Sequence, residues 1–505
     1  MEPLSSMKLS AIIQGTGARG DAAGDPEVVR VTGDSRAVVP GAAFFALPGA
    51  TLDGHDFAAE AARRGAVAVI AERPVACAPA ALLLAPSSRR AMAIAAANFH
   101  GRPGDALALA AVTGTNGKTT VAWLVEACAR AAGTPVGLLG TVVHRWPGAE
   151  RDAGHTTPES TEVQALLAEM RAAGARAAVL EVSSHALAQE RVAGMRFRVA
   201  GFTNLTRDHL DYHGDMERYF AAKRRLFTEH LAPDGVAVVN VRDAAGARLA
   251  DQLGPGRTVW RYGGRADDAL RAEGVSAGLD GTAATFTTPA GPVEVRSPLV
   301  GAHNLENLLC AAGMALGLGV SPDAVARGLS GCAGAPGRLE RFSARGVSVF
   351  VDYAHTDDAL ARALAALRSL SPRRLVCVFG CGGDRDRGKR PLMGEAAGRG
   401  ADQVVVTSDN PRTEEPAAIV AEILPGLERA GLSRLSADAL RRGGRGFAVE
   451  PERRAAIALA VSAAREGDAV LVAGKGHEPY QIVGKERLPF SDRDEARRAL
   501  GIPPP

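Results

Sequence analysis

Short apolar runs alternate with segments of helical periodicity along much of this chain. The run 106–112 predicts a buried strand. After the glycine-containing turn that follows, Val121, Leu124, Val125 and Cys128 recur at the i, i+3, i+4, i+7 spacing of one helix face. Strands and helices that alternate in this way build parallel sheets, so the pattern predicts an α/β protein.

The alternation is clearest in the C-terminal third. Four apolar runs predict buried strands there, namely Val347 to Asp352, Leu375 to Phe379, Gln403 to Thr407 and Ala469 to Ala473. Helical patterns lie between or beside them, beginning at Asp357, Lys389, Glu414 and Glu452. This order predicts βαβ crossovers in a doubly wound, Rossmann-like sheet.

Three other segments lead to separate expectations. Val236 to Asn240 is predicted to close the parallel sheet in the middle of the chain. Residues 257–300, rich in Thr, Val and Gly, predict β-hairpins. Residues 433–448, with several Arg and Gly, predict an exposed and mobile insertion to which we assign no chemistry.

The length of the chain sets the number of domains. Its 505 residues predict about three domains of ~150 residues each. Gly101-Arg102-Pro103-Gly104 has the composition of a linker. We therefore expect a smaller α/β N-terminal domain over 1–105, a central domain over 106–335 and the Rossmann-like domain over 336–505.

Composition narrows the classes of function. Hydrophobic residues make up 46% and charged residues 23%, and the net charge is only +3, which argues against a nucleic-acid groove or a membrane surface. Residues 1–20 contain no apolar core of signal-peptide length, and the chain contains no run of about 18 apolar residues. The six cysteines lack a paired C-x-x-C framework, which favours reduced thiols over disulfides or a metal site. We expect a cytoplasmic protein.

The turn after the strand 106–112 carries the strongest motif, Gly114-Thr115-Asn116-Gly117-Lys118-Thr119-Thr120. Glycines let the backbone approach phosphate oxygens, and the amides at the following helix start attract anions. Lys118 can reach the terminal phosphates, and the Thr119 hydroxyl can coordinate Mg²⁺. The general pattern has a glycine where this chain has Val112. A turn with a merely exposed lysine is the alternative, but the strand–turn–helix context favours ATP binding in a central sheet of the P-loop ATPase type.

Two later strand ends carry polar residues suited to a metal. Glu181 ends the apolar strand Ala177 to Val182, and a carboxylate at that edge can bind Mg²⁺. The segment 203–214 contains His209 and His213 with two aspartates, for which zinc is the rival ligand. Because the segment lacks the glutamate of H-E-x-x-H and a nearby cysteine, magnesium is favoured over zinc.

Other polar residues keep two interpretations on pattern alone. A turn with Ser35 and Arg36 can bind a pyrophosphate or be a simple turn. Asn304 can contact the adenine edge or cap the helix it precedes. Lys223 lies in a basic helix and, taken alone, predicts a solvated surface lysine.

Every polar motif of the C-terminal third follows a predicted strand. These motifs are 352–356, 380–390, 408–412 and 474–478. Because ligands bind at the carboxyl edge of an open parallel sheet, four polar turns at that edge predict a second binding site.

Five motifs together resemble the Mur ligase family, in the expected order over almost the whole chain. They are Gly114 to Thr120, Glu181-Val182-Ser183-Ser184-His185, Thr203-Asn204-Leu205 with Asp208 to His213, Asp352-Tyr353-Ala354-His355, and Gly474-Lys475-Gly476-His477-Glu478. The resemblance implies a UDP-binding N-terminal domain, a central ATPase and a C-terminal domain that brings in the amino acid. It also implies a cytoplasmic enzyme of peptidoglycan synthesis, working as a monomer whose C-terminal domain moves.

The resemblance implies roles for individual residues. Catalytic roles fall on Lys118, Lys223 as a carbamate, and His209. Magnesium ligands fall on Thr119, Glu181, His209 and carbamylated Lys223. ATP contacts fall on Gly114, Thr115, Asn116, Gly117, Lys118, Thr119, Thr120, Asn304, Arg338 and Asp352. Contacts to the UDP-linked substrate fall on Ser35, Thr156, Thr157, Ser183, Gln189 and Arg191. One departure from the family pattern is Asp357, where a proline is expected.

Asp409-Asn410-Pro411-Arg412 matches the motif of members that add meso-diaminopimelate to UDP-N-acetylmuramoyl-L-alanyl-D-glutamate. The resemblance assigns this amino acid to Arg385, Asp409, Asn410, Pro411, Arg412, Gly474 and Glu478. An arginine can bind the distal carboxylate of diaminopimelate, which lysine lacks. If lysine were bound instead, the arginine would be left without a partner. The alternatives are an L-lysine-adding member, a folylpolyglutamate-synthase-like ligase and, from another class, an ATP-binding switch module without ligase activity.

Overall fold

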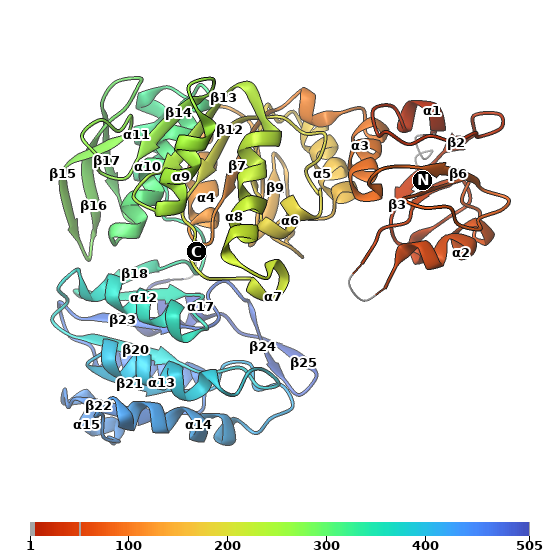
Figure 1. The fold of residues 1–505 in the computed structure, drawn as a ribbon. Coiled ribbons are helices and arrows are strands. Elements are labelled where there is room, and N and C mark those ends of the chain that lie inside the picture. Colours follow the sequence, from red (N-terminus) through yellow and green to blue (C-terminus); the bar gives the residue numbers. More distant parts are fainter. Residues whose placement is uncertain (1–5, 50–51, 504–505) are drawn as a thin grey trace. The chain divides into compact units, whose positions relative to one another are not determined.

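The fold comes from a computed structural model that describes residues 6–49 and 52–503 (Figure 1). The outer ends of the first and third predicted domains lie outside the described residues. The chain groups into two compact units. One comprises Met1–Arg271, Thr288–Gly291 and Leu309–Gly328, and the other comprises Ala272–Thr287, Pro292–Leu308 and Leu329–Pro505. Both are α/β with parallel sheets, which confirms the predicted fold class.

The first unit begins with a four-stranded sheet in the order β3-β4-β5-β6. Its parallel strands are β3 (Arg30–Thr32), β4 (Ala42–Phe45), β5 (Ala68–Ala71) and β6 (Ala81–Leu84). Helices α2 (Ala58–Arg63) and α3 (Ser88–Phe99) pack on it. Around them lie β1 (Met7–Lys8), α1 (Leu9–Ile12), β2 (Glu27–Val28), η1 (Ser35–Ala37), η2 (Gly54–Phe57) and η3 (Pro103–Asp105). All four residues of β4 are buried, because the strand carries apolar side chains on both faces of the sheet.

An eight-stranded sheet forms the centre of the first unit, in the order β10-β9-β8-β11-β7-β12-β13-β14. Its strands are β7 (Ala108–Thr113), β8 (Val136–Leu139), β9 (Val143–Trp146), β10 (Ala149–Asp152), β11 (Ala177–Glu181), β12 (Phe197–Phe202), β13 (Leu231–Asn240) and β14 (Thr258–Tyr262). Six of these strands are parallel to one another, namely β8, β11, β7, β12, β13 and β14. At one edge of the sheet, β9 pairs antiparallel with β8, and β10 pairs antiparallel with β9. The predicted strand at 106–112 is therefore present, and it lies between β11 and β12.

Helices cover both faces of this sheet. Leu109 and Ala111 of β7 point to a core shared with α5 (Ser160–Ala172), α8 (Met216–Arg225) and α9 (Ala244–Leu253). On the other face lie α4 (Lys118–Ala131) and α10 (Ala302–Gly317), where Gly201 of β12 leaves room for the sulfur of Met314. The remaining elements are α6 (Ser184–Ala188), α7 (Leu210–His213), η4 (Leu226–His230) and α11 (Pro322–Gly331).

The end of the central sheet differs from the prediction. β13 does not close it, because β14 adds a further parallel strand at residues that we expected to form a hairpin. Only Tyr262 of β14 is buried, and the other four residues are exposed or half-buried, which agrees with a position at the edge of the sheet. Hairpin structure begins later, with β15 (Arg271–Gly278), β16 (Gly281–Thr287) and β17 (Val293–Ser297), of which β16 and β17 pair antiparallel.

The second unit contains a six-stranded sheet in the order β18-β19-β23-β20-β21-β22. Its strands are β18 (Glu340–Ala344), β19 (Val347–Asp352), β20 (Leu375–Phe379), β21 (Gln403–Val406), β22 (Gly446–Val449) and β23 (Ala469–Ala473). Only β18 is antiparallel to its neighbour. All four strands predicted for this part of the chain are confirmed.

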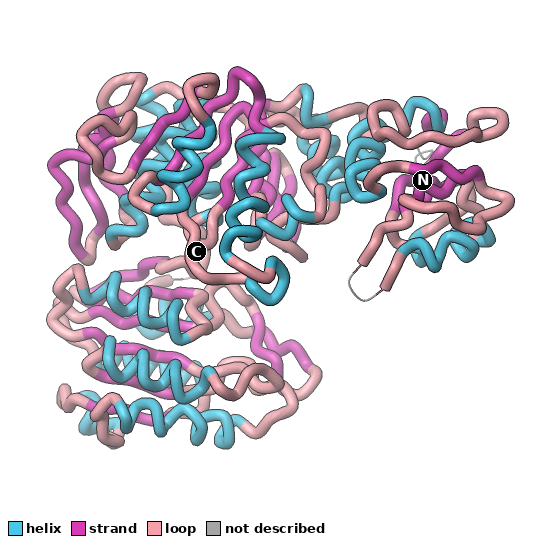
Figure 2. The backbone as a smooth tube through the Cα atoms, viewed as in Figure 1, coloured by secondary structure: helices cyan, strands magenta, loops and turns pink. Residues whose placement is uncertain are grey.

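Helices cover both faces of the six-stranded sheet, and Figure 2 shows one of these two layers in front of the strands. One face packs against α12 (Asp357–Arg368), α13 (Lys389–Gly400) and α14 (Pro416–Arg429). The other face packs against α15 (Ala437–Arg441), α16 (Arg453–Ala463) and α17 (Asp492–Leu500). The sheet is therefore doubly wound, as predicted.

The prediction of an exposed insertion at 433–448 was wrong. Residues 437–441 form α15, and Gly446 begins β22, which pairs with β21. Leu440 and Phe447 are buried in this structure. The error arose because arginine and glycine dominate the composition, whereas two apolar side chains suffice to attach the segment to the sheet.

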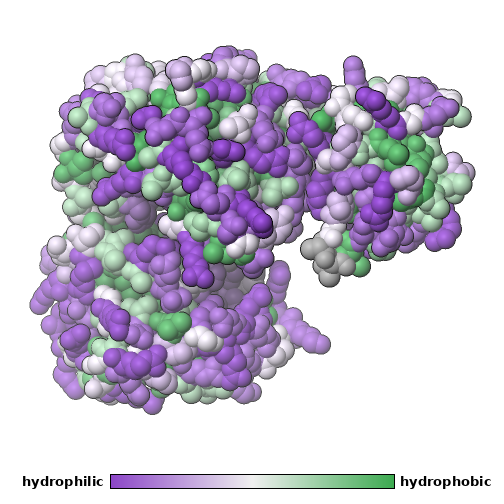
Figure 3. All heavy atoms as spheres, viewed as in Figure 1, coloured by the Kyte–Doolittle hydropathy of each residue, from purple (hydrophilic) through white to green (hydrophobic). Residues whose placement is uncertain are grey.

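The surface is mixed in character. Hydrophilic side chains predominate on the face shown in Figure 3, and hydrophobic ones are scattered among them. Among the helices that the structure describes, none has the length and apolarity to span a bilayer.

Candidate functional site

The glycine-rich turn leads from β7 into α4 and forms a tight phosphate-binding loop. Gly114 has a φ of 150°, and a Cβ there would lie 1.9 Å from the Thr203 hydroxyl oxygen, so only glycine fits. The Thr203 hydroxyl donates to the Asn116 carbonyl oxygen at 2.6 Å. Val112, where a glycine was expected, is buried within β7. Position 112 therefore belongs to the strand and not to the loop.

Two lysines meet at the carbonyl oxygen of Gly114. Lys118 Nζ donates to it at 2.9 Å and to the Thr115 oxygen at 2.8 Å, and Lys223 Nζ donates to it at 2.8 Å. Lys223 is buried, with 1% of its surface exposed, contrary to the surface position that its helix suggested. Burial, followed by the nearby charge of Lys118, holds the pKa of Lys223 well below its ordinary value.

Glu181 is buried beside this loop and accepts three hydrogen bonds. Its donors are the Thr119 hydroxyl at 2.8 Å, the Thr141 amide at 2.8 Å and the Thr141 hydroxyl at 3.0 Å. Glu181 stands opposite Val112 in the pairing of β11 with β7, which brings its carboxylate to the start of α4. An oxygen-rich group of this kind suits Mg²⁺.

The ligand set for magnesium is incomplete without a modification. Among residues 6–49 and 52–503, no three His, Cys, Asp or Glu side chains are arranged to hold a metal ion. Thr119 and Glu181 are in contact and offer hydroxyl and carboxylate oxygens. Lys223 would add oxygen ligands only as a carbamate. The residues present therefore fit magnesium on the condition that Lys223 is modified.

His209 lies in an aromatic cluster next to Lys223. Its ring centroid is 4.8 Å from that of His185 and 6.2 Å from that of Tyr219. Tyr219 also contacts Lys223, whose Nζ lies 4.6 Å from the ring centroid, and its hydroxyl is 3.2 Å from that of Thr115. Burial and the neighbouring charges lower the pKa of His213 in the same cluster to about 4. Tyr219 thus connects His209 to the lysine.

Four of the residues predicted to bind the UDP-linked substrate form one cluster. Arg191 donates to the Thr157 carbonyl oxygen at 2.6 Å and to the Gln189 side-chain oxygen at 2.8 Å. The Ser183 amide donates to the Thr157 hydroxyl at 3.1 Å. Ser35 lies in η1, and no hydrogen bond or ion pair of the described residues joins it to this cluster.

Thr156 lies between this cluster and the Glu181 carboxylate, which is predicted to bind the metal. The Thr156 hydroxyl oxygen lies 3.1 Å from that of Thr141, which itself donates to Glu181. Thr157 also donates to the Glu181 backbone oxygen at 2.8 Å. The predicted substrate cluster is therefore connected to the predicted metal site through neighbouring threonines.

The three ATP contacts predicted outside the loop lie in the second unit. Asn304 is buried, donates to the Val300 carbonyl oxygen at 2.9 Å and accepts from Asn307 at 3.0 Å. Asn304 lies within α10, and its side-chain oxygen accepts from another side chain rather than from a backbone amide, so the capping interpretation is not confirmed and the ATP contact stays a prediction. The Asp352 carboxylate accepts the amide of Leu339 at 2.8 Å.

Arg338 is the third of these residues. Its guanidinium carbon lies 4.9 Å from the centroid of the Tyr353 ring, against which the ring of His477 also packs at 5.2 Å. Burial, followed by the charge of Arg338, lowers the pKa of His477 to about 4. Arg338 precedes β18, which pairs antiparallel with β19, so it lies beside Asp352 at the end of β19.

The residues predicted for the amino acid meet at the carboxyl ends of β21 and β23. The Asn410 side-chain amide donates to Glu478 at 3.1 Å. Asp409 packs against Gly474, where a Cβ would lie 2.4 Å from the Asp409 carboxylate. Pro411 follows in the same turn and is buried. The prediction that these motifs share one sheet edge is confirmed, because both strands are parallel neighbours of β20.

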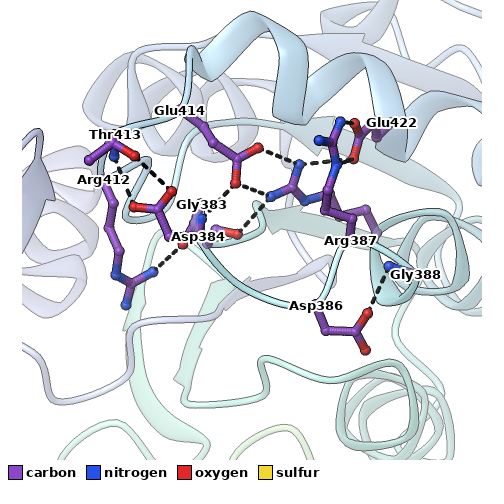
Figure 4. Close-up of polar contacts among 11 residues, drawn as sticks. Gly383, Asp384, Asp386, Arg387, Gly388, Arg412, Thr413, Glu414 and Glu422 are labelled. Carbon is purple, nitrogen blue, oxygen red and sulfur yellow. Dashed lines mark hydrogen bonds and ion pairs between the residues drawn. The ribbon is translucent and has the colours of Figure 1, made fainter.

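Arg412 reaches across to the turn after β20 (Figure 4). Its guanidinium donates to the Gly383 carbonyl oxygen at 2.8 Å, and its backbone has a φ of 51°. Thr413 donates to Asp384 at 2.8 Å, and the Asp384 amide donates to Glu414 at 2.6 Å. Arg385 is exposed on the same turn. The two turns are thus held together by a chain of polar contacts.

Sequence reasoning missed three residues of these sites. Arg390 is fully buried and donates to both Glu414 and Glu422, and Lys475 is fully buried beside Asn410. Arg390 lies in the motif 380–390 and Lys475 in the motif 474–478, but the sequence pattern assigned neither residue a role. Tyr219 had a detectable signal, because it stands four residues before Lys223 and so shares its helix face.

The fold and the first site define a nucleotide-binding protein of the phosphate-loop class, with a doubly wound second sheet. Three family models match the chain: "Mur ligase family, catalytic domain" over residues 27–102, "Mur ligase middle domain" over 112–315, and "Mur ligase, glutamate ligase domain" over 337–476. The chain belongs to the Mur ligase family, whose members are ATP-dependent ligases.

Individual relatives extend the match over the whole chain. UDP-N-acetylmuramoyl-L-alanyl-D-glutamate–2,6-diaminopimelate ligase of Geobacter sulfurreducens is 49% identical over 97% of this chain and 98% of its own length. A solved structure of a ligase with the same name is 34% identical, with a TM-score of 0.73, over 98% of this chain and 99% of that one. Folylpolyglutamate synthase of Mycobacterium tuberculosis, complexed with ADP, has a TM-score of 0.59 at 21% identity, over 77% of this chain and 91% of that one, and shares the fold alone.

Proposed function

We propose that this enzyme joins meso-diaminopimelate to UDP-N-acetylmuramoyl-L-alanyl-D-glutamate, with ATP converted to ADP and phosphate. The observation that carries the proposal is the 49% identity, over 97% of the chain, to a ligase named for this reaction. The amide product belongs to peptidoglycan precursor synthesis.

The first site supports activation of a carboxylate. The substrate γ-carboxylate attacks the γ-phosphorus of ATP, ADP leaves, and an acyl phosphate forms. Both reactants are anionic, so the site must supply positive charge and hold them in line. Lys118 and the amides at the start of α4 do this, and Lys118 is already folded over the loop. Magnesium, when bound at Thr119, Glu181, His209 and carbamylated Lys223, would neutralise charge on the phosphates.

The second step forms the amide. An amine attacks the carbonyl carbon of the acyl phosphate, and phosphate leaves with the bonding electrons. The ammonium group of the amino acid loses one proton to solvent before this attack, and the nitrogen loses a second proton to solvent afterwards to give the neutral amide. We infer that Arg385, Asp409, Asn410, Arg412, Gly474 and Glu478 hold the amino acid for this attack. Arg412 suits the distal carboxylate of diaminopimelate, because a guanidinium binds a carboxylate through two parallel hydrogen bonds.

The burial of Lys223 supports its modification. Only a neutral amine can attack CO₂, and burial lowers the pKa of this lysine so that the neutral form is accessible. Carbamylation would replace a cation by an anion with two oxygen donors. We infer that Lys223 acts in that form.

We further infer that the enzyme is a cytoplasmic monomer with functional domains at 1–105, 106–335 and 336–505. No disulfide links the described cysteines, which suits a reducing compartment. The matched family models fall within these three ranges. Light scattering after size exclusion would test the monomer directly, and a stable dimer would contradict it.

The test is phosphate release from ATP with the UDP-linked dipeptide and either meso-diaminopimelate or L-lysine. We expect strong release with diaminopimelate only, reduced at least ~100-fold in kcat/KM by Arg412→Ala. Arg442→Ala, at an exposed arginine of the same unit, is the matched control. Release with lysine would indicate the lysine-adding alternative, and release without an amine would indicate a switch module.

A further inference from the structure

A buried cation lies behind the predicted amino-acid site. Lys475 follows β23, and none of its side chain is exposed. Its Nζ lies 3.0 Å from the Asn410 side-chain oxygen and 3.2 Å from Glu478 Oε2. A buried ammonium is costly unless it is paired and hydrogen-bonded, and these two partners supply both. Both partners are residues that we infer to contact the amino acid.

Lys475 determines which way the Asn410 amide faces. The Asn410 oxygen accepts from Lys475 and, at 2.9 Å, from the backbone amide of Ile482. Rotating the amide would place its NH₂ group against two donors, so only one orientation is compatible with the contacts. The NH₂ group then donates one hydrogen to Glu478 at 3.1 Å and keeps a second hydrogen for a ligand.

The same contacts orient the Glu478 carboxylate. Its Oε2 accepts from both Asn410 and Lys475, whereas Oε1 accepts from none of the described side chains. The Glu478 side chain is 20% exposed. It therefore offers Oε1 as an acceptor while Asn410 offers an N–H as a donor.

We propose that Lys475 is a positioning residue for amino-acid recognition, which holds Asn410 and Glu478 so that they present one donor and one acceptor to an amino acid. Such a pair matches a ligand group that carries a carboxylate and an ammonium on one carbon. Both ends of diaminopimelate carry this combination, whereas the side-chain end of lysine carries only an ammonium. The inference rests on the proposed function and adds a residue without an assigned role.

The experiment measures steady-state kinetics of Lys475→Met for all three substrates. We expect the KM for diaminopimelate to rise ~10- to 100-fold, because a charged hydrogen-bonding partner is lost behind the site. The KM for ATP and for the UDP-linked dipeptide should stay within about 2-fold. Lys485→Met, at an exposed lysine of the same unit, is the matched control. Should Lys475→Met fail to fold, Lys475→Gln retains a neutral donor and should give a smaller rise in the same KM.

A double-mutant cycle separates positioning from general stability. If Lys475 acts through Glu478, then the KM for diaminopimelate in Lys475→Met with Glu478→Gln should be close to that of Glu478→Gln alone. Multiplicative effects, parallel changes in all three KM values, or an unchanged KM for diaminopimelate would each overturn the inference. Failure of the proposed function would give a different result, because the wild-type enzyme itself would then show no diaminopimelate-dependent ADP formation.

Discussion

The Nζ atom of Lys223 donates to the carbonyl oxygen of Gly114 at 2.8 Å, although the two residues are 109 positions apart in the sequence. This bond attaches helix α8 to the phosphate-binding loop. It also places a buried amine next to Lys118, whose charge contributes to the lowered pKa of Lys223. The position suits a lysine that reacts with CO₂ and then faces the nucleotide.

Replacing Lys223 by Met should lower kcat at least ~100-fold, because the site loses the carbamate that would complete the magnesium ligand set. A short carboxylate such as acetate should restore part of the rate by occupying the space of the carbamate. ADP formation, measured with and without acetate, checks both expectations. Lys8→Met, at a half-exposed lysine, is the control. Full activity of Lys223→Met would contradict the assigned role.

Replacing Thr141 by Val should raise the Mg²⁺ concentration needed for half-maximal activity ~10- to 100-fold. The Thr141 hydroxyl donates to Glu181 at 3.0 Å, and groups that orient a metal ligand contribute to affinity on this scale. Thr141→Ser keeps the hydroxyl and should behave like the wild-type enzyme. A magnesium titration of ADP formation distinguishes the two variants, and identical curves would contradict a positioning role for Thr141.

Replacing Arg390 by Met should lower the free energy of unfolding of the second unit by about 2–4 kcal/mol. Arg390 is fully buried and binds Glu414 at 2.7 and 2.9 Å and Glu422 at 2.8 Å, so its loss leaves two carboxylates without their shared cation. Urea unfolding measures the change. Arg399→Met on the same helix, at an arginine that is 71% exposed, should change it by less than about 1 kcal/mol. Equal losses in both variants would contradict the argument.

Stability should fall as the pH is lowered from about 6.5 to about 4. Burial lowers the pKa of His230 from 6.5 to about 4, so in this window the unfolded chain binds a proton that the folded chain does not. One such group contributes a slope of up to about 1.4 kcal/mol per pH unit, and the slope ends below about 4.

The variant His230→Phe tests this slope. It should reduce the loss of stability per pH unit, whereas His155→Phe, at an exposed histidine, serves as the control. Thermal unfolding midpoints measured across the window check the expectation. An unchanged slope in His230→Phe would show that other groups dominate the acid sensitivity.

Much of the fold could be predicted from local pattern. The strand and helix that flank the phosphate-binding loop were predicted from apolar spacing, because a buried strand and a one-faced helix need only their own residues to be recognised. The segment 433–448 was misjudged, because its attachment depends on β21, a partner that local composition does not reveal.

The sequence by itself determined the α/β class, the phosphate-binding loop and the motifs at the strand ends. It could not determine which of these motifs meet, since that depends on the order of strands in the sheets. Only the tertiary structure placed Lys223 in the interior beside Gly114 and oriented Asn410 and Glu478 around Lys475. The physical reason is that burial and hydrogen-bond partners come from residues far away in the chain. A lysine has the same local signature whether it faces water or a closed site.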